Sequence, residues 1–201
     1  MAVHQQTKPH VGKAQAWLLA TRPKTLPASI VPVVLGGAFA QSRGCWEGVV
    51  FIAILSASVG IQIATNLVND LCDYLRGTDR EDRLGPLRAA QSGLLSVKEM
   101  KLGIAAVVGV LIILGYFLVS RAGLPVLTIG VFSLALAFLY TAGPYPLAYS
   151  PFSEFFVLLF FGPVAVGGTY YILCGRVCAA ALWAGLGCGF ISSAILCVNN
   201  L

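Results

Sequence analysis

The stretch Gln62-Ile-Ala-Thr-Asn66-Leu-Val-Asn69-Asp70-Leu-Cys-Asp73 closes an apolar run that begins at residue 48. Residues 48–68 form 21 consecutive positions without a formal charge. As an α-helix this run would be about 31 Å long, which is enough to cross the hydrocarbon core of a bilayer. The polar residues of the stretch are spaced four, three, one and three positions apart, so a helix places them on one face. The stretch therefore predicts a membrane-spanning helix with a polar stripe that ends in two carboxylates.

Two interpretations of this polar stripe are open. Asp70 and Asp73 could mark the point where the helix leaves the membrane, with Gln62 and Asn66 bonded to a neighbouring helix. Alternatively, the stripe forms a functional site, because carboxylates in or near hydrocarbon are costly and tend to face a cavity, an ion or a partner charge. Five polar residues share the face and further acids follow in the next loop. The sequence therefore favours the functional site.

The composition is that of an integral membrane protein. Hydrophobic residues make up 58% of the 201 residues and charged residues 10%, and the mean hydropathy is +0.85. In a soluble domain, roughly a quarter of all residues are charged. The net charge of +5 is therefore not read as a sign of nucleic-acid binding. The six cysteines form no Cys-x-x-Cys pair and both histidines lie near the N-terminus, so neither a zinc nor an iron–sulfur site is predicted.

The apolar runs predict an all-α, multi-pass transmembrane helical bundle. A polar tail at residues 1–16 comes first, and a short amphipathic piece at residues 17–20 is expected at the membrane interface, with Trp17 as an anchor. Two prolines fall in the first crossing, where neighbouring helices can satisfy the backbone groups that proline frees. The expected crossings are residues 25–41, 48–68, 102–120, 123–142, 155–173 and 177–198.

The basic residues are unequally divided between the two sides of the predicted bundle. If the loops alternate, ten of the 13 lysines and arginines lie on the side of the N-terminus and of loop 70–101. The other three, Arg43, Arg121 and Arg176, lie on the opposite side. The positive-inside rule therefore predicts that the N-terminus and loop 70–101 are cytoplasmic.

Loop 70–101 is the one long connection in the chain and carries four arginines among its acids. Arginine forks suit phosphate oxygens, and carboxylates suit Mg²⁺, which prefers one or two carboxylates plus substrate phosphates. A diphosphate–Mg²⁺ complex is the ligand that this combination predicts. For Arg80, Glu81 and Asp82 the alternative is a solvated loop of mutually paired charges.

Asn69-Asp70-Leu-Cys-Asp73 resembles the first Asp-rich motif, Asn-Asp-x-x-Asp-x-x-x-Asp, of the UbiA-type intramembrane prenyltransferases. One branch of that family, the 1,4-dihydroxy-2-naphthoate polyprenyltransferases of menaquinone biosynthesis, is similar over residues 17–201. The segments that carry this resemblance are Arg22-Pro-Lys-Thr-Leu-Pro27, Asn66-Leu-Val-Asn-Asp70, Arg83-Leu-Gly-Pro86, Gln91-Ser-Gly93, Tyr140-Thr-Ala-Gly-Pro-Tyr-Pro146 and Phe161-Gly-Pro-Val-Ala-Val-Gly-Gly-Thr-Tyr170.

The resemblance implies an all-helical protein, normally of nine transmembrane helices, of which about six would be present here. It implies transfer of a polyprenyl chain from polyprenyl diphosphate to 1,4-dihydroxy-2-naphthoate, with loss of carbon dioxide, to give demethylmenaquinone. The implied cofactor is Mg²⁺, and the implied location is the lipid bilayer of a bacterial cytoplasmic membrane.

Site residues also follow from the resemblance. It implies that Asp70, Asp73 and Tyr140 act in catalysis, with the ring face of Tyr140 stabilising an allylic cation; an interfacial anchor is the alternative role for this tyrosine. The third Asp of the motif would fall at Gly77, so Asp79 is the expected substitute. The implied metal ligands are Asn66, Asn69, Asp70, Asp73 and Asp79, and the implied diphosphate-binding residues are Arg22, Arg83 and Arg88.

One departure from the family concerns its second Asp-rich motif. The chain stops at Asn199-Asn200-Leu201, which resembles the opening of that motif. We therefore expect the domain at residues 17–201 to be incomplete at its C-terminus and inactive alone. The alternatives are another UbiA-type aromatic prenyltransferase, a non-catalytic fragment, or a transporter or channel, which a polar stripe and proline-broken helices would also suit.

Overall fold

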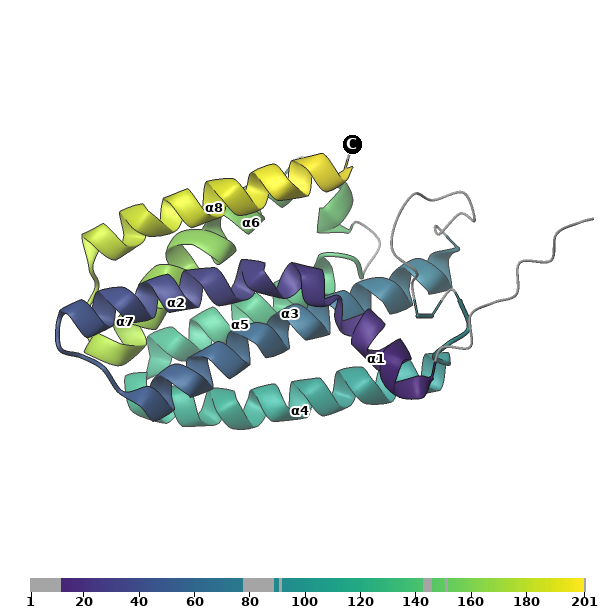
Figure 1. The fold of residues 1–201 in the computed structure, drawn as a ribbon, viewed down its shortest axis with the longest axis horizontal. Coiled ribbons are helices and arrows are strands. Elements are labelled where there is room, and N and C mark those ends of the chain that lie inside the picture. Colours follow the sequence, from purple (N-terminus) through teal and green to yellow (C-terminus); the bar gives the residue numbers. More distant parts are fainter. Residues whose placement is uncertain (1–11, 78–88, 91, 143–145, 151, 201) are drawn as a thin grey trace, which may run out of the picture.

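The computed structural model describes residues 12–77, 89–90, 92–142, 146–150 and 152–200. These residues form helices and connections, with no strand among them, so the predicted all-α class is confirmed (Figure 1). The elements are α1 (Lys13–Thr21), η1 (Pro23–Thr25), α2 (Leu26–Ser42), α3 (Gly48–Arg76), α4 (Val97–Ala122), α5 (Leu124–Leu139), η2 (Leu147–Tyr149), α6 (Ser153–Leu159), η3 (Phe160–Val164), α7 (Ala165–Cys174) and α8 (Ala179–Asn200).

Four helical segments are long and apolar enough to cross a membrane, namely α3, α4, Ser153–Cys174 and Ala179–Val198. A fifth crossing is possible if Lys13–Thr25 and Pro27–Ser42, which meet at a bend of 55°, count as one span. The chain is thus an integral membrane protein. Each predicted crossing coincides with one or more helical segments, but α2 and α5 have only 17 and 16 residues. At 1.5 Å per residue they are about 26 and 24 Å long, which is shorter than a typical hydrocarbon core.

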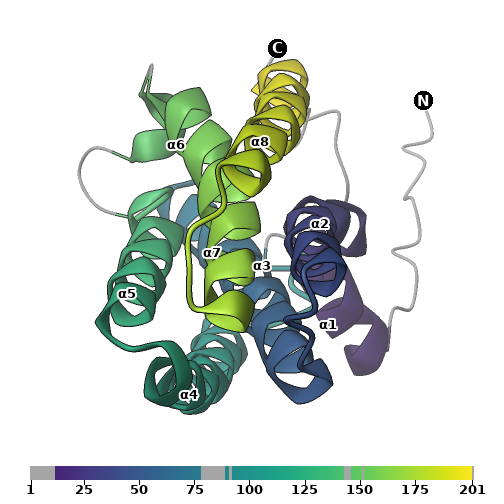
Figure 2. The same ribbon diagram turned by 90° about the vertical axis from the view of Figure 1, so that its left-hand side faces the viewer.

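Helix α3 lies at the centre of the bundle and packs against α1, α2, α4, α5 and α7 (Figure 2). It runs eight residues beyond the predicted end of the crossing, so the whole polar stripe is helical. Gly77 ends it with a left-handed backbone (φ 65°) and donates its N–H to the Asp73 and Tyr74 carbonyls, a conformation that glycine adopts readily.

The connection between α3 and α4 is shorter than the predicted loop 70–101. Helix α3 ends at Arg76 and α4 begins at Val97. The start of α4 is fixed by a capping box, in which Ser96 Oγ accepts from the Glu99 N–H and the Glu99 carboxylate accepts from the Ser96 N–H. The capping box thus fixes the start of α4 inside the predicted loop, and α3 extends into the loop from the other side as far as Arg76.

Helix α1 is packed onto α3 and α4. Ala16 and Ala20 are fully buried in a core that includes Leu67, Leu71 and Met100. The Trp17 ring lies directly over Gly103 of α4, where a Cβ atom would overlap the indole. The absence of a side chain at position 103 therefore lets the partly buried Trp17 ring pack against α4, a contact that periodicity alone did not predict.

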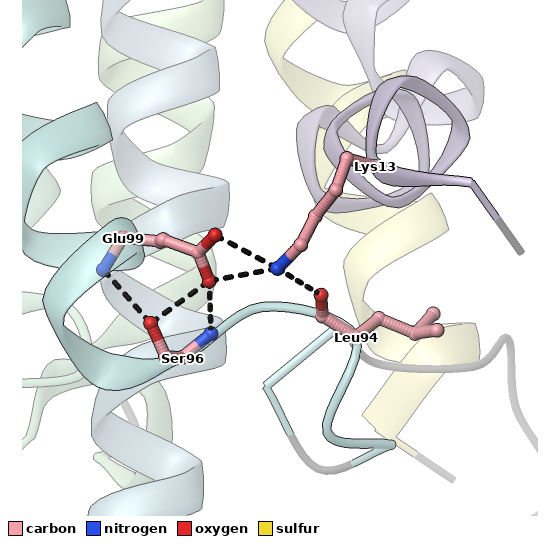
Figure 3. A network of polar contacts seen from close by, with 4 residues as sticks. All are labelled: Lys13, Leu94, Ser96 and Glu99. Atoms are coloured by element: carbon pink, nitrogen blue, oxygen red, sulfur yellow. Dashed lines mark hydrogen bonds and ion pairs between the residues drawn. The ribbon is translucent and has the colours of Figure 1, made fainter.

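A polar contact fastens the start of α1 to the start of α4 (Figure 3). Lys13 Nζ donates to the Leu94 carbonyl at 3.1 Å and to Glu99 Oε1 and Oε2 at 2.7 and 3.0 Å. Both charged side chains are exposed, and exposed ion pairs contribute little to stability. The contact matters because it fixes where α1 and the segment before α4 lie.

The predicted crossing at residues 155–173 is a broken helix. Its middle, η3, is a π-helical turn with non-helical angles at Gly162 (φ −110°, ψ −114°) followed by Pro163. Helix α8 packs against the break through glycines, because a Cβ at Gly185 would lie 2.8 Å from Pro163 Cα. A Cβ at Gly189 would overlap the Leu158 carbonyl oxygen. The two backbones are therefore in direct contact.

Candidate active site

The two carboxylates of the polar stripe are buried near the C-terminal end of α3. Asp70 is 2% exposed and Asp73 is 7% exposed, and the Oδ1 atom of each is fully buried. They are three positions apart in the helix, so they lie on one helical face. Buried carboxylates are costly unless other groups stabilise them, and their contacts therefore indicate what this end of the helix is built to hold.

Asp70 fixes the segment that precedes α4. Its Oδ2 accepts hydrogen bonds from the backbone N–H groups of Ala89 and Ala90, at 3.1 and 3.4 Å. Ala89, Ala90 and Leu95 are buried, at 1%, 4% and 2% exposed. The returning part of the α3–α4 connection is thus packed onto the carboxylate end of α3. This second role of Asp70 could not be predicted from the sequence, because a backbone partner 19 residues away leaves no periodic pattern.

Asn69 connects the stripe to the segment after α5. Its Oδ1 accepts a hydrogen bond from Thr141 Oγ1, and Thr141 is 3% exposed. Sequence reasoning did not single out Thr141, although it lies inside the segment from Tyr140 to Pro146 that carries the family resemblance. The contact brings the end of α5 against the polar face of α3.

Tyr140 immediately precedes Thr141 and is half-buried at the end of α5. Its backbone carbonyl accepts from the Ala148 N–H at 2.9 Å, which holds η2 close to this residue.

Asn66 lies one helical turn before Asp70 and contacts the N-terminal segment. Its Nδ2 donates to the Thr21 carbonyl at 2.8 Å and to Thr25 Oγ1 at 2.9 Å. These partners flank Arg22, which ends α1 in a left-handed conformation (φ 50°, ψ 68°). These hydrogen bonds therefore place the Arg22 turn against the polar face of α3.

Only part of the predicted site lies within the described residues. The structure brings Asn66, Asn69, Asp70, Asp73 and the Arg22 turn to one face of α3, and contact with Thr141 places the neighbouring Tyr140 beside them. Asp79, Arg83 and Arg88 lie outside the described residues. Within the described part of the chain, no three His, Cys, Asp or Glu side chains are grouped so as to hold a metal ion.

The oxygen atoms present nevertheless suit a hard divalent cation. Asp70 and Asp73 supply two buried carboxylates beside the Asn69 amide. Mg²⁺ is usually held by one or two carboxylates, with water and substrate phosphates completing its shell. The donor set therefore fits Mg²⁺ together with a phosphate-bearing substrate.

Comparison with known proteins is consistent with this site. A family model described as "UbiA prenyltransferase family" matches residues 29–201. The "1,4-dihydroxy-2-naphthoate octaprenyltransferase" of Escherichia coli (strain K12) is 33% identical over 201 residues, covering 97% of this chain and 65% of that protein. The protein of the same name from Bacillus subtilis (strain 168) is 33% identical over 186 residues, covering 92% and 59%.

A more distant relative is "UbiA prenyltransferase domain-containing protein 1" of Gallus gallus. It is 29% identical over 192 residues, covering 94% of this chain and 57% of that protein. The chain thus spans about 65% or less of the length of each of these three relatives.

Proposed function

From the chain's membership of the UbiA prenyltransferase family, we propose that it transfers a polyprenyl chain from polyprenyl diphosphate to 1,4-dihydroxy-2-naphthoate. The acceptor is inferred from the names of the bacterial relatives. The observation that carries the proposal is the pair of buried carboxylates, Asp70 and Asp73, at the end of a membrane-spanning helix. A transporter or channel is not supported by this family membership.

In the proposed reaction, the allylic C–O bond of the donor breaks and the diphosphate leaves with the electron pair. The electron-rich ring carbon that bears the carboxylate forms the new C–C bond, and carbon dioxide leaves. The product is the prenylated 1,4-naphthalenediol, and its separate oxidation by molecular oxygen, which takes up two electrons and two protons, gives demethylmenaquinone. In this proposal the half-buried Tyr140 lies near the allylic cation, which its ring face stabilises.

In this proposal the negatively charged diphosphate group of the donor binds at the end of α3 that carries Asp70 and Asp73. Enzymes of this family are generally metal-dependent, and we assign Mg²⁺ to Asp70, Asp73 and Asn69, with Asp79 as a further ligand. Bound there, Mg²⁺ would neutralise the diphosphate charge that develops as the C–O bond breaks. The guanidinium groups of Arg22, Arg83 and Arg88 bind phosphate oxygens.

The proposed activity is tested on the protein expressed from its complete gene in a host that lacks its own dihydroxynaphthoate prenyltransferase. Membranes are supplied with Mg²⁺, a polyprenyl diphosphate and either 1,4-dihydroxy-2-naphthoate or a one-ring hydroxybenzoate. We expect prenylated naphthoquinone and release of carbon dioxide with the first acceptor. Product from the hydroxybenzoate alone would instead identify another aromatic prenyltransferase, and no product from either acceptor would contradict the proposed activity.

We also propose that the carboxylate end of α3 faces the cytoplasm of a bacterial cell, because ten of the 13 basic residues belong to that side. A topology reporter before Trp17 and one between α3 and α4 should both read as cytoplasmic. A reporter between α2 and α3 should read from the opposite side. Finding either of the first two reporters outside the cytoplasm would reverse the orientation.

A further inference from the structure

The turn at Arg22 has an unusual backbone. Among the described residues, Arg22 is the one non-glycine residue with a positive φ, at 50°, and such a conformation is uncommon for residues with a side chain. Its N–H donates to the Leu19 carbonyl at 3.1 Å, and its carbonyl accepts from the Thr25 N–H at 2.9 Å. The turn lies where Lys13–Thr25 and Pro27–Ser42 meet at 55°.

Side chains of α3 hold this turn. Asn66, which is 3% exposed, donates to the residues on both sides of Arg22, through the Thr21 carbonyl and Thr25 Oγ1. Thr25 Oγ1 in turn donates to the Arg22 carbonyl at 2.9 Å. Gln62 Nε2 lies 3.4 Å from Thr25 Oγ1 and 3.5 Å from Asn66 Oδ1. The network therefore joins one turn of α3 to the Arg22 backbone.

The chemistry of the partners fixes the orientation of the Asn66 amide. A backbone carbonyl accepts hydrogen bonds and cannot donate them, so the group facing the Thr21 carbonyl must be the Asn66 NH₂. Both of its N–H groups are occupied, one by each threonine partner. The Oδ1 atom consequently faces Gln62.

We propose that Asn66 is a positioning residue for Arg22 and not a metal ligand. Its amide holds the left-handed turn against α3, so that Arg22 lies at the end of the bundle that carries Asp70 and Asp73. This inference rests on the proposed function in one respect, namely that Arg22 binds the diphosphate of the donor.

Asn66→Asp separates the two roles. Aspartate keeps an oxygen at the same place, so a metal ligand would retain or strengthen its bond to Mg²⁺. A positioning residue would lose both donated hydrogen bonds and face the Thr21 carbonyl with a negative oxygen. We expect the KM for polyprenyl diphosphate to rise about tenfold or more. The Mg²⁺ concentration for half-maximal rate and the KM for the aromatic acceptor should remain within about twofold of wild type.

Thr25 provides an independent variant that cannot act through a metal ligand. Thr25→Val removes the hydroxyl that accepts from Asn66 and should raise the same KM, whereas Thr25→Ser keeps the hydroxyl and should restore it. The control is Thr65→Val on α3, where the lost hydroxyl donates to the Ile61 carbonyl of its own helix. This control should leave the KM for the donor unchanged.

Two readouts do not depend on prenyl transfer. Hydrogen–deuterium exchange of the full chain in detergent should be faster across residues 13–25 in Asn66→Asp than in wild type or Thr65→Val. Calorimetric binding of inorganic diphosphate in the presence of Mg²⁺ should weaken about tenfold in the same variant. If wild type transfers no prenyl group but both results hold, the proposed activity fails and the positioning role stands.

The positioning role is overturned by any of three results. The first is unchanged exchange across residues 13–25 in Asn66→Asp. The second is faster exchange with unchanged affinity for diphosphate, which would show that the turn does not position a diphosphate ligand. The third is a raised Mg²⁺ requirement as the main defect, which would assign Asn66 to the metal.

Discussion

Asp73→Asn is expected to lower the rate of prenyl transfer by about 100-fold or more while the protein still folds. The substitution preserves the size of the side chain and removes a carboxylate that is 7% exposed. A loss of 100-fold corresponds to about 2.7 kcal/mol of transition-state stabilisation, which is within the range expected when a metal ligand that neutralises developing charge is lost. The measurement is the initial rate at saturating acceptor over a series of Mg²⁺ concentrations.

Glu47→Gln is the matched control for Asp73→Asn. Glu47 also loses a carboxylate in this variant, but its partner is Arg121 at the other end of the bundle. Its transfer rate should stay near that of wild type. Turnover of Asp73→Asn within a few-fold of the control would remove Asp73 from the proposed metal site.

Gly189→Ala is expected to destabilise the bundle strongly for so small a change. The added methyl group would overlap the Leu158 carbonyl oxygen and lie 3.0 Å from the Leu158 carbonyl carbon. Both atoms belong to backbone, so α8 must move away from α6. Overpacking of this kind typically costs about 1–3 kcal/mol, and we expect a lower midpoint of thermal unfolding in detergent, followed by tryptophan fluorescence.

Gly187→Ala on the same helix is the control for this effect. A Cβ at position 187 meets no atom within 4 Å. Both substitutions improve helix propensity by about 1 kcal/mol, so the difference between the two variants isolates the overlap with Leu158. If Gly189→Ala is as stable as Gly187→Ala, α6 and α8 are not in direct backbone contact.

Local pattern was enough to predict the helices and the polar face of α3. Uncharged runs of about 20 residues mark crossings because the bilayer sets their length, and spacings of three and four residues keep Asn66, Asp70 and Asp73 together. The break at Gly162 was not predicted, although Gly162-Pro163 is a helix-breaking pair within the run from residue 155 to 173. The sequence carries this signal but not the packing of the π-helical turn against the glycines of α8.

Most features of the site that were not predicted from the sequence are contacts between residues far apart in the chain. Asn66 was expected as a metal ligand because it opens the segment Asn66–Asp70 that carries the family resemblance, yet its NH₂ group contacts residues more than 40 positions earlier. The hydrogen bonds from Ala89 and Ala90 to Asp70 involve backbone groups, which carry no sequence signal. The metal and diphosphate roles of the site residues remain predictions.

The contact between Lys13 and Glu99 has a consequence for biosynthesis. The two residues are 86 positions apart, and a ribosome adds about 5–20 residues per second. Glu99 is therefore synthesised about 4–17 s after Lys13. Asn66, the partner of the Thr21 carbonyl, is synthesised only 45 residues after Thr21. The nascent N-terminal helix can consequently dock onto α3 first, and α4 completes its attachment only later in translation.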